Sequence, residues 1–173
     1  MKIKIILSIL FLFISMIAII VFYINTNRIR MNLLENLRSV YLVTSDNRLY
    51  NMDFIDDKYE YILIVYFHPE CDFCNIEIND LLENESDLKM LQILFVSYAS
   101  IEEIKQFILM NPICISENIT IVSDIKGEFA NAYNIKSPPT NFIYDKNKRL
   151  VKIHKGMMSF KQLKKYLKYS FKN

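Results

Sequence analysis

YILIVYFHPECDFCNIEI, residues 61–78, joins an apolar run to two cysteines that lie three positions apart. The run 61–67 is apolar throughout and rich in β-branched residues, which is typical of a strand buried on both faces. Pro69 ends that strand. Apolar residues then recur at helical spacing, so a helix is expected from Cys74 to Leu82, with Asp72 available as a cap near its start. The stretch predicts a strand, a turn that carries the cysteines, and a helix.

Cys71 and Cys74 form a C-x-x-C pattern at the expected start of that helix. Unpaired backbone N–H groups and the helix dipole stabilise negative charge at a helix start, and they lower the pKa of a thiol located there. Cys71 is then the thiolate nucleophile. Cys74, one turn on and more buried, attacks the resulting mixed disulfide and releases the product. The spacing is therefore suited to thiol–disulfide exchange.

Metal binding is the main alternative interpretation of the cysteine pair. A structural zinc site needs four ligands, and the other candidates are Cys114, His68 and His154. His68 lies too close in the chain to join the cysteines, and His154 is expected inside a strand. Two thiolates with His154 would suit copper(I), which soft ligands select. A purely structural disulfide is disfavoured, because a four-residue loop closes little chain entropy. We expect no metal site and a buried, hydrophobic role for Cys114.

The N-terminal region contains an uncharged run of 20 residues from Ile5 to Ile24. A helix of that length spans roughly 30 Å of hydrocarbon. The run is longer than the apolar part of a cleavable signal peptide and ends in bulky residues, so an uncleaved anchor is expected at 1–24. Residues 25–38 are predicted to be a juxtamembrane spacer with a short helix from Arg28 to Arg38. Residues 39–173 are predicted to be one domain.

The rest of the chain alternates predicted strands with predicted helices. A hairpin is expected around 45–47, where turn-forming residues interrupt an alternating apolar pattern. Ser100 and Glu103 form a capping-box pattern for a helix that ends before Pro112. Further strands are expected at 91–98, 119–122, 140–145 and 149–155, and helices at 100–110, 127–133 and from Ser159 onward. The order predicts an α/β fold, a three-layer α/β/α sandwich whose mixed central sheet is mainly parallel.

The charges are nearly balanced, with 21 Lys and Arg against 19 Asp and Glu and a net charge of +2. With the two signs mixed, no broad basic surface for nucleic acid is expected. The final helix, SFKQLKKYLKYSFK at 159–172, has an apolar stripe that predicts packing against the domain, with its lysines facing solvent. A position on a membrane surface is the alternative for this basic helix.

The order of elements, the CDFC motif, SPPTNFIYD at 137–145 and Gly156 together resemble the thioredoxin superfamily. The resemblance is closer to its membrane-anchored, outward-facing TlpA/ResA-like branch of bacterial thiol-disulfide oxidoreductases. It covers Val40 to about Phe171. The helix and strand between Ser100 and Val122 match an insertion of this branch. A thioredoxin-like fold is therefore implied.

The resemblance implies a role for each matching residue. Cys71 matches the attacking cysteine and Cys74 the resolving cysteine. Pro139, before Thr140, matches the cis-proline that packs next to the disulfide and helps to bind substrate. Glu77 matches the glutamate of a C-x-x-C-x-x-E pattern, where it modulates the thiol pKa or relays a proton. The expected catalytic residues are Cys71, Cys74 and Glu77, and the expected substrate-binding residues are Pro138, Pro139 and Thr140.

Three residues depart from the family pattern. Glu70 stands where the family usually has Trp, and Asp72 follows Cys71. These two carboxylates oppose thiolate formation, which favours a less oxidising, reductase-type pair. Pro138 lacks the backbone N–H that the family residue before the cis-proline offers to an extended substrate. We therefore expect one fewer backbone hydrogen bond to a peptide substrate, and a preference for a particular partner.

The implied function is a membrane-anchored thiol-disulfide oxidoreductase that reduces protein disulfides and needs no cofactor beyond the Cys71–Cys74 pair. Its partners would be protein thiol or disulfide substrates and a membrane electron donor, because no outer compartment keeps a thiol buffer like that of the cytosol. Short N-terminal tails normally stay inside, so the domain is expected on the periplasmic or exterior side of the bacterial inner membrane. The alternatives are a peroxiredoxin-like peroxidase, whose P-x-x-x-T-x-x-C pattern is absent here, and a non-enzymatic thioredoxin-fold metallochaperone.

Overall fold

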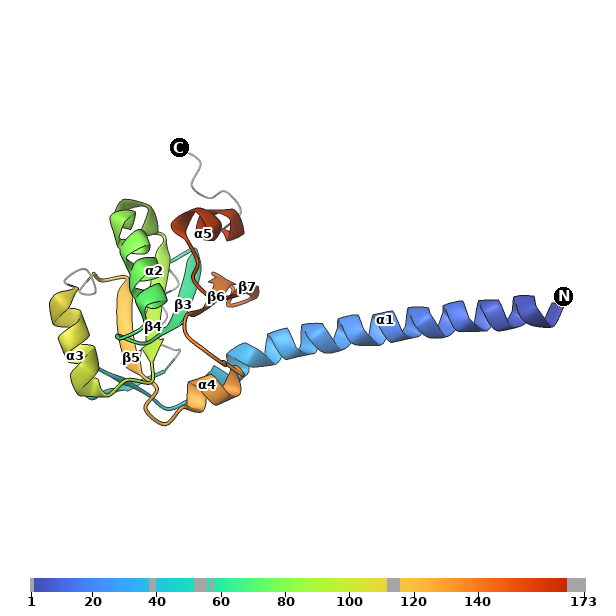
Figure 1. The fold of residues 1–173 in the computed structure, drawn as a ribbon, viewed down its shortest axis with the longest axis horizontal. Helices are drawn as coiled ribbons and strands as arrows, with labels where there is room; N and C mark the ends of the chain where they lie inside the picture. The colour runs from blue at the N-terminus through green and yellow to red at the C-terminus, as the bar shows by residue number, and fades with distance from the viewer. Residues whose placement is uncertain (1, 38–39, 52–55, 57, 112–115, 168–173) are drawn as a thin grey trace.

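The computed structural model describes residues 2–37, 40–51, 56, 58–111 and 116–167. A long helix precedes a domain built on one seven-stranded sheet (Figure 1). The strands are β1 (Leu42–Thr44), β2 (Leu49–Tyr50), β3 (Tyr61–Phe67), β4 (Leu91–Ser97), β5 (Ile119–Ser123), β6 (Thr140–Asp145) and β7 (Leu150–Lys155). The helices are α1 (Lys2–Leu37), α2 (Asp72–Glu83), the 3₁₀ helix η2 (Glu85–Leu88), α3 (Ile101–Met110), α4 (Glu128–Ala132) and α5 (Phe160–Tyr166).

The sheet has the strand order β2-β1-β5-β4-β3-β6-β7. The three central strands β5, β4 and β3 run parallel to one another. The pairs on both sides of them are antiparallel. The expectation of a mainly parallel sheet is therefore wrong, although the sheet is mixed as predicted. Tight turns at 45–48 and 146–149 account for the pairs β1–β2 and β6–β7, because a parallel pair needs a crossover of a dozen or more residues and a tight turn can only reverse the chain. The other antiparallel pairs, β1–β5 and β3–β6, join strands that are far apart in the sequence.

Helices cover both faces of the sheet. On one face, Phe95 of β4 belongs to a buried core with Ile78 of α2, Phe107 of α3 and Leu163 of α5. On the other face, Phe129 of α4 packs into a second buried core. Burial of these apolar side chains is the main favourable contribution to folding. The predicted three-layer α/β/α arrangement is confirmed.

Two helices begin with the capping boxes that stabilise a helix start. Ser100 accepts a hydrogen bond from the Glu103 N–H, and the Glu103 carboxylate accepts one from the Ser100 N–H at 2.8 Å. Ser159 and Gln162 make the same pair of contacts at the start of α5. The first box confirms the sequence prediction. The part of the predicted last helix beyond Leu167 lies outside the described residues.

The N-terminal helix α1 is continuous from Lys2 to Leu37. Residues 2–24 of the predicted anchor and residues 25–37 of the predicted spacer therefore lie in one helix. Its segment Ile6–Asn25 is long and apolar enough to cross a bilayer, and none of that segment is buried inside the protein. Figure 1 shows the helix projecting away from the domain, with its C-terminal end beside α4. In the described structure, the apolar surface of this segment is left uncovered by the domain.

Candidate active site

The C-x-x-C pair lies at the junction between β3 and α2. Cys71 and Cys74 form a disulfide whose Cα atoms are 5.2 Å apart. Helix α2 begins at Asp72, and Cys71 is its N-cap residue, with φ −88° and ψ 108°. The Cys71 sulfur accepts a hydrogen bond from the Cys74 N–H at 3.2 Å, the role that a side-chain oxygen has in most N-caps. The helix starts two residues earlier than expected, because this sulfur and not the Asp72 carboxylate caps it.

The two sulfur atoms differ in their access to solvent. Cys71 is partly exposed, whereas Cys74 is completely buried. A protein substrate can therefore reach Cys71 first. The N-terminus of α2 also stabilises a thiolate at Cys71, because the helix dipole and the free N–H groups point at it. The asymmetry suits an exposed attacking cysteine and a buried resolving one.

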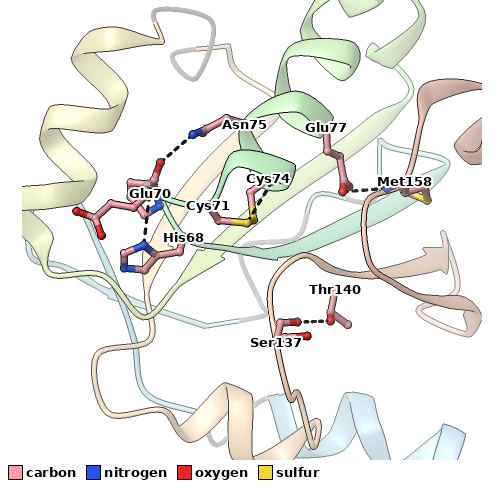
Figure 2. The surroundings of a disulfide bond; sticks show 10 residues. His68, Glu70, Cys71, Cys74, Asn75, Glu77, Ser137, Thr140 and Met158 are labelled. Carbon is pink, nitrogen blue, oxygen red and sulfur yellow. Dashed lines mark hydrogen bonds between the residues drawn. A yellow bond between two sulfur atoms is a disulfide. The ribbon is translucent and has the colours of Figure 1, made fainter.

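Hydrogen bonds hold the loop between β3 and α2. The His68 carbonyl accepts from the Cys71 N–H at 3.0 Å. The Asn75 side chain donates to the Pro69 carbonyl at 3.0 Å, and His68 Nδ1 accepts from the Glu70 N–H at 3.3 Å. Figure 2 shows these side chains gathered on one side of the disulfide. These hydrogen bonds therefore fix the backbone conformation of the loop that carries Cys71.

Two carboxylates flank Cys71, as the sequence indicates. Glu70 and Asp72 are both exposed, and neither forms a salt bridge with a cation in the described part of the chain. Their charges oppose a thiolate at Cys71. Because solvent screens exposed charges, we expect a smaller effect from them than from a buried carboxylate.

The histidines of the metal interpretations are engaged elsewhere. The His68 ring lies 4.4 Å from the ring of Tyr98. The two ring nitrogens of His154 lie 3.2 Å from the Tyr166 hydroxyl and 3.2 Å from the Met157 carbonyl. Among the described residues, no group of three or more His, Cys, Asp and Glu side chains is placed to hold a metal ion. Cys114, the remaining candidate ligand, lies outside those residues.

Glu77 is a buried carboxylate one turn beyond Cys74, with only 1% of its surface exposed. Its Oε2 accepts a hydrogen bond from the Met158 N–H at 3.0 Å, as Figure 2 shows. Its Oε1 has no hydrogen-bond partner among the described residues. Burial raises the pKa of Glu77 to about 7, against the opposing effects of the Met158 N–H and the Asn141 side chain, and Asp80 adds a small upward shift. Glu77 can therefore take or give a proton near neutral pH.

A groove connects the region around Glu77 with solvent. It has a volume of about 400 Å³, runs between α2 and residues 157–159, and is lined in part by Glu77 and Asp80. Asp80 also accepts a hydrogen bond from the Phe160 N–H at 2.7 Å. The two carboxylates thus fasten the start of α5 to α2, while the groove offers a path along which a proton from Glu77 can leave.

Asn141 is a second buried polar residue beside this carboxylate, and the sequence motifs do not single it out. It lies opposite Val65 in the sheet, is completely buried, and neither polar atom of its side chain has a hydrogen-bond partner among the described residues. Its presence lowers the pKa of Glu77. An amide can donate to a carboxylate and accept from a carboxylic acid, so Asn141 suits both states of Glu77. The available signal is one polar residue inside the apolar strand TNFIYD.

Replacing Asn141 by Leu is expected to raise the pKa of Glu77 above its native value. The Leu side chain fills a similar volume but removes the dipole that stabilises the charged carboxylate. Carbon-13 NMR titration of the labelled glutamate carboxyl groups would measure the change. Asn131→Leu, at an exposed site on α4, is the control. A Glu77 titration at unchanged or lower pH in the Asn141 variant would contradict the assignment.

The residues predicted to bind substrate precede and begin β6. The Pro138–Pro139 peptide bond is cis. Thr140 lies opposite Tyr66 near the end of β3, so the loop before it runs close to the strand end that leads to the cysteines. The Pro139 carbonyl accepts from the Gly156 N–H at 2.9 Å, and the Thr140 hydroxyl donates to the Ser137 carbonyl at 2.8 Å (Figure 2). The fold therefore brings this loop to the same end of the sheet as the disulfide.

Known proteins were found that are similar to this chain in sequence or in structure. The model of the AhpC/TSA family matches residues 38–153. No curated protein sequence matches the chain. Many solved structures do match it, and three of them illustrate the likeness.

One is a secreted Mycobacterium tuberculosis disulfide oxidoreductase homologous to E. coli DsbE, with 17% identity, a TM-score of 0.63, and coverage of 78% of this chain and 97% of that one. StoA from Bacillus subtilis has 20% identity, a TM-score of 0.56, and coverage of 73% and 93%. The exposed lipoprotein thioredoxin Etrx1 from Streptococcus pneumoniae strain TIGR4 has 22% identity, a TM-score of 0.59, and coverage of 74% and 96%. At these identities the likeness establishes the fold, so the predicted thioredoxin-like fold is confirmed.

Proposed function

Because the chain belongs to the AhpC/TSA family, we propose that it is a membrane-anchored thiol-disulfide oxidoreductase that reduces protein disulfides outside the cytoplasm. The observation that carries this proposal is the disulfide between a partly exposed Cys71, at the N-cap of α2, and a completely buried Cys74. Such a pair can form a mixed disulfide at its exposed sulfur and resolve it from its buried sulfur.

The proposed reaction starts from the reduced pair. The Cys71 thiolate attacks one sulfur of the substrate disulfide, forming a mixed disulfide and releasing the other sulfur as a thiolate. The Cys74 thiol loses its proton to Glu77 and attacks Cys71, which re-forms the Cys71–Cys74 bond and releases the second substrate sulfur. Two electrons pass to the substrate, and protons from Cys74 and from solvent complete its two thiols. The pKa of Glu77, about 7, suits it to accept the proton.

The loop before β6 is the proposed substrate-binding segment. Pro138, Pro139 and Thr140 lie at the disulfide end of the sheet and are partly or fully buried. Pro138 has no N–H, so an extended substrate placed along this loop would find one backbone donor fewer. We propose that this favours a particular protein partner over general clients.

The proposed direction is reduction of the substrate. Exposed Glu70 and Asp72 destabilise the Cys71 thiolate, and a less stable reduced form makes the pair a better reductant. The electrons would then come from a donor in the membrane that α1 crosses, since Ile6–Asn25 is long and apolar enough to span it. The domain would face the periplasm or the exterior of a bacterial cell.

The reduction potential of the full chain in detergent tests the proposed direction. Equilibration with dithiothreitol buffers is expected to give a potential near the thioredoxin value of about −270 mV. A value near that of DsbA, about −120 mV, would reverse the direction. Rapid turnover of hydrogen peroxide would favour a peroxidase, and one tightly held copper or zinc ion per reduced chain would favour a metallochaperone. Either outcome would contradict the proposal.

A further inference from the structure

Positive and negative charges are separated along this chain, although their totals nearly cancel. Ten of the 21 Lys and Arg residues follow Asp145, and no Asp or Glu follows it. The expectation that the charges are mixed is therefore wrong for the C-terminal part of the sequence. A segment of this kind exerts a one-signed field on any surface close to it.

The structure gathers the described members of this group on one edge of the domain. Those among the described residues, up to Lys165, lie on the turn between β6 and β7, on β7 and on α5, and β7 is an outermost strand of the sheet. Five of them are exposed and form no salt bridge with the described carboxylates, and we call them the basic edge: Lys146, Lys152, Lys155, Lys161 and Lys165. By contrast, Arg149 pairs with Asp145 at 2.8 Å and Lys164 with Asp87 at 3.1 Å.

We propose that the basic edge docks on the anionic phospholipid headgroups of the membrane that holds α1. The chain itself brings this surface near lipid. Figure 1 shows β7 and α5 on the side of the domain toward which α1 projects. This proposal rests on the membrane anchoring in the proposed function, and it goes further by assigning a second, peripheral contact between the domain and the bilayer.

The distances along α1 permit the contact. Twelve helical residues between Asn25, the end of the apolar segment, and Leu37 extend about 18 Å. The headgroup layer takes up roughly 5–7 Å of that length. The remaining gap is close to the Debye length of about 10 Å at 0.1 M salt, and tilting of α1 closes it. The lysines of the basic edge are therefore within electrostatic reach of the headgroups.

Docking by this edge would also orient the disulfide. Lys155 lies opposite Thr140 in the β6–β7 pair. Thr140 is the residue directly after the cis-proline Pro139. The residue after Lys155, Gly156, donates its N–H to the Pro139 carbonyl. One end of the basic edge thus adjoins the proposed substrate-binding loop. Lipid contact along the edge would hold this loop and the disulfide near the membrane surface, where a membrane electron donor would meet them.

Lysines on an outer strand also prevent edge-to-edge pairing between sheets. That protective role does not depend on lipid charge, so the two explanations predict different results. An acidic protein or a nucleic acid is a different class of partner for the same cations. Lipid is favoured because α1 keeps a bilayer next to the domain in every molecule.

The test uses the full chain in nanodiscs of phosphatidylcholine alone or of phosphatidylcholine mixed with phosphatidylglycerol. Lysine acetylation by a water-soluble reagent is followed by mass spectrometry. The basic edge is expected to react at least about fivefold more slowly in the anionic discs, since each lysine near such a surface contributes about that factor in affinity. High salt should remove the protection.

Two variants sharpen the test. Replacing the four basic-edge lysines after Lys146 by Gln should abolish the protection of Lys146. The matched control replaces four exposed lysines outside the edge, namely Lys58, Lys89, Lys105 and Lys126, and should leave it unchanged.

Equal acetylation rates in both kinds of nanodisc would overturn the lipid contact. Protection by an RNA oligonucleotide or an acidic protein, without protection by anionic discs, would overturn it as well. Reduction of a peptide disulfide, measured on the same samples, reports separately on the proposed activity. A chain that fails to co-elute with either kind of disc would contradict both the anchoring and the docking.

Discussion

Cys71→Ser is expected to abolish disulfide reduction by the full chain, lowering the rate by more than about a thousandfold. A serine hydroxyl is not ionised near neutral pH and cannot form the mixed disulfide, whereas the helix start stabilises a thiolate at this position. The rate is measured with a fluorescent peptide disulfide and dithiothreitol as the electron source. Cys114→Ser is the matched control and should retain the native rate. Substantial turnover by the Cys71 variant, or its loss in the Cys114 variant, would contradict the assignment.

Replacing the second cysteine of the pair, Cys74→Ser, removes the resolving sulfur and keeps the attacking sulfur of Cys71. Mixed disulfides at Cys71 should therefore accumulate and be recoverable with their substrates attached. The same trap tests the role of Pro138. If the missing N–H narrows the choice of substrate, Pro138→Thr should widen the set of trapped proteins. An unchanged set would count against this role.

Much of the fold follows from local patterns in the sequence. The apolar run that becomes β3 is buried at Ile62 to Phe67, as expected of a central strand. The capping box at Ser100 is present. Strand partners are harder to predict, because the hydrophobic pattern of a strand indicates how it is buried. It does not indicate which strand lies next to it or whether the two run parallel or antiparallel. The antiparallel pairing of β1 with β5 and of β3 with β6, strands that are far apart in the sequence, therefore made the sheet less parallel than expected.

The candidate site could be predicted in part. The position of the cysteines at a strand-to-helix junction is a local feature, and the structure confirms it. The environment of Glu77 is not local. Its burial depends on Met158 and Asn141, which lie far along the chain and reach it only after β6 and α5 pack against α2. Likewise, a net charge near zero conceals the basic edge, because the separation of charge along the chain is lost in the total.

The second large effect that we expect is a dependence of stability on pH, caused by the buried Glu77. A pKa raised from 4.5 to about 7 means that the folded protein keeps a proton that the unfolded chain releases. The stability that this proton contributes is fully present below pH 4.5 and is lost as the pH rises through 7. The shift corresponds to about 3 kcal/mol in the free energy of unfolding.

Glu77→Gln should remove this pH dependence while keeping an oxygen that accepts the Met158 N–H. We expect the native chain to lose about 3 kcal/mol more than the variant between pH 4 and pH 9. Urea unfolding of the full chain in detergent, followed by circular dichroism, measures the difference, and groups common to both proteins cancel. Glu83→Gln, at an exposed site on the same helix, should behave like the native chain. Parallel stability curves for the native chain and Glu77→Gln would mean that Glu77 titrates in the folded protein at its ordinary pKa of 4.5. Its carboxylate would then be a weak base at neutral pH, which would contradict its role as the proton acceptor for Cys74.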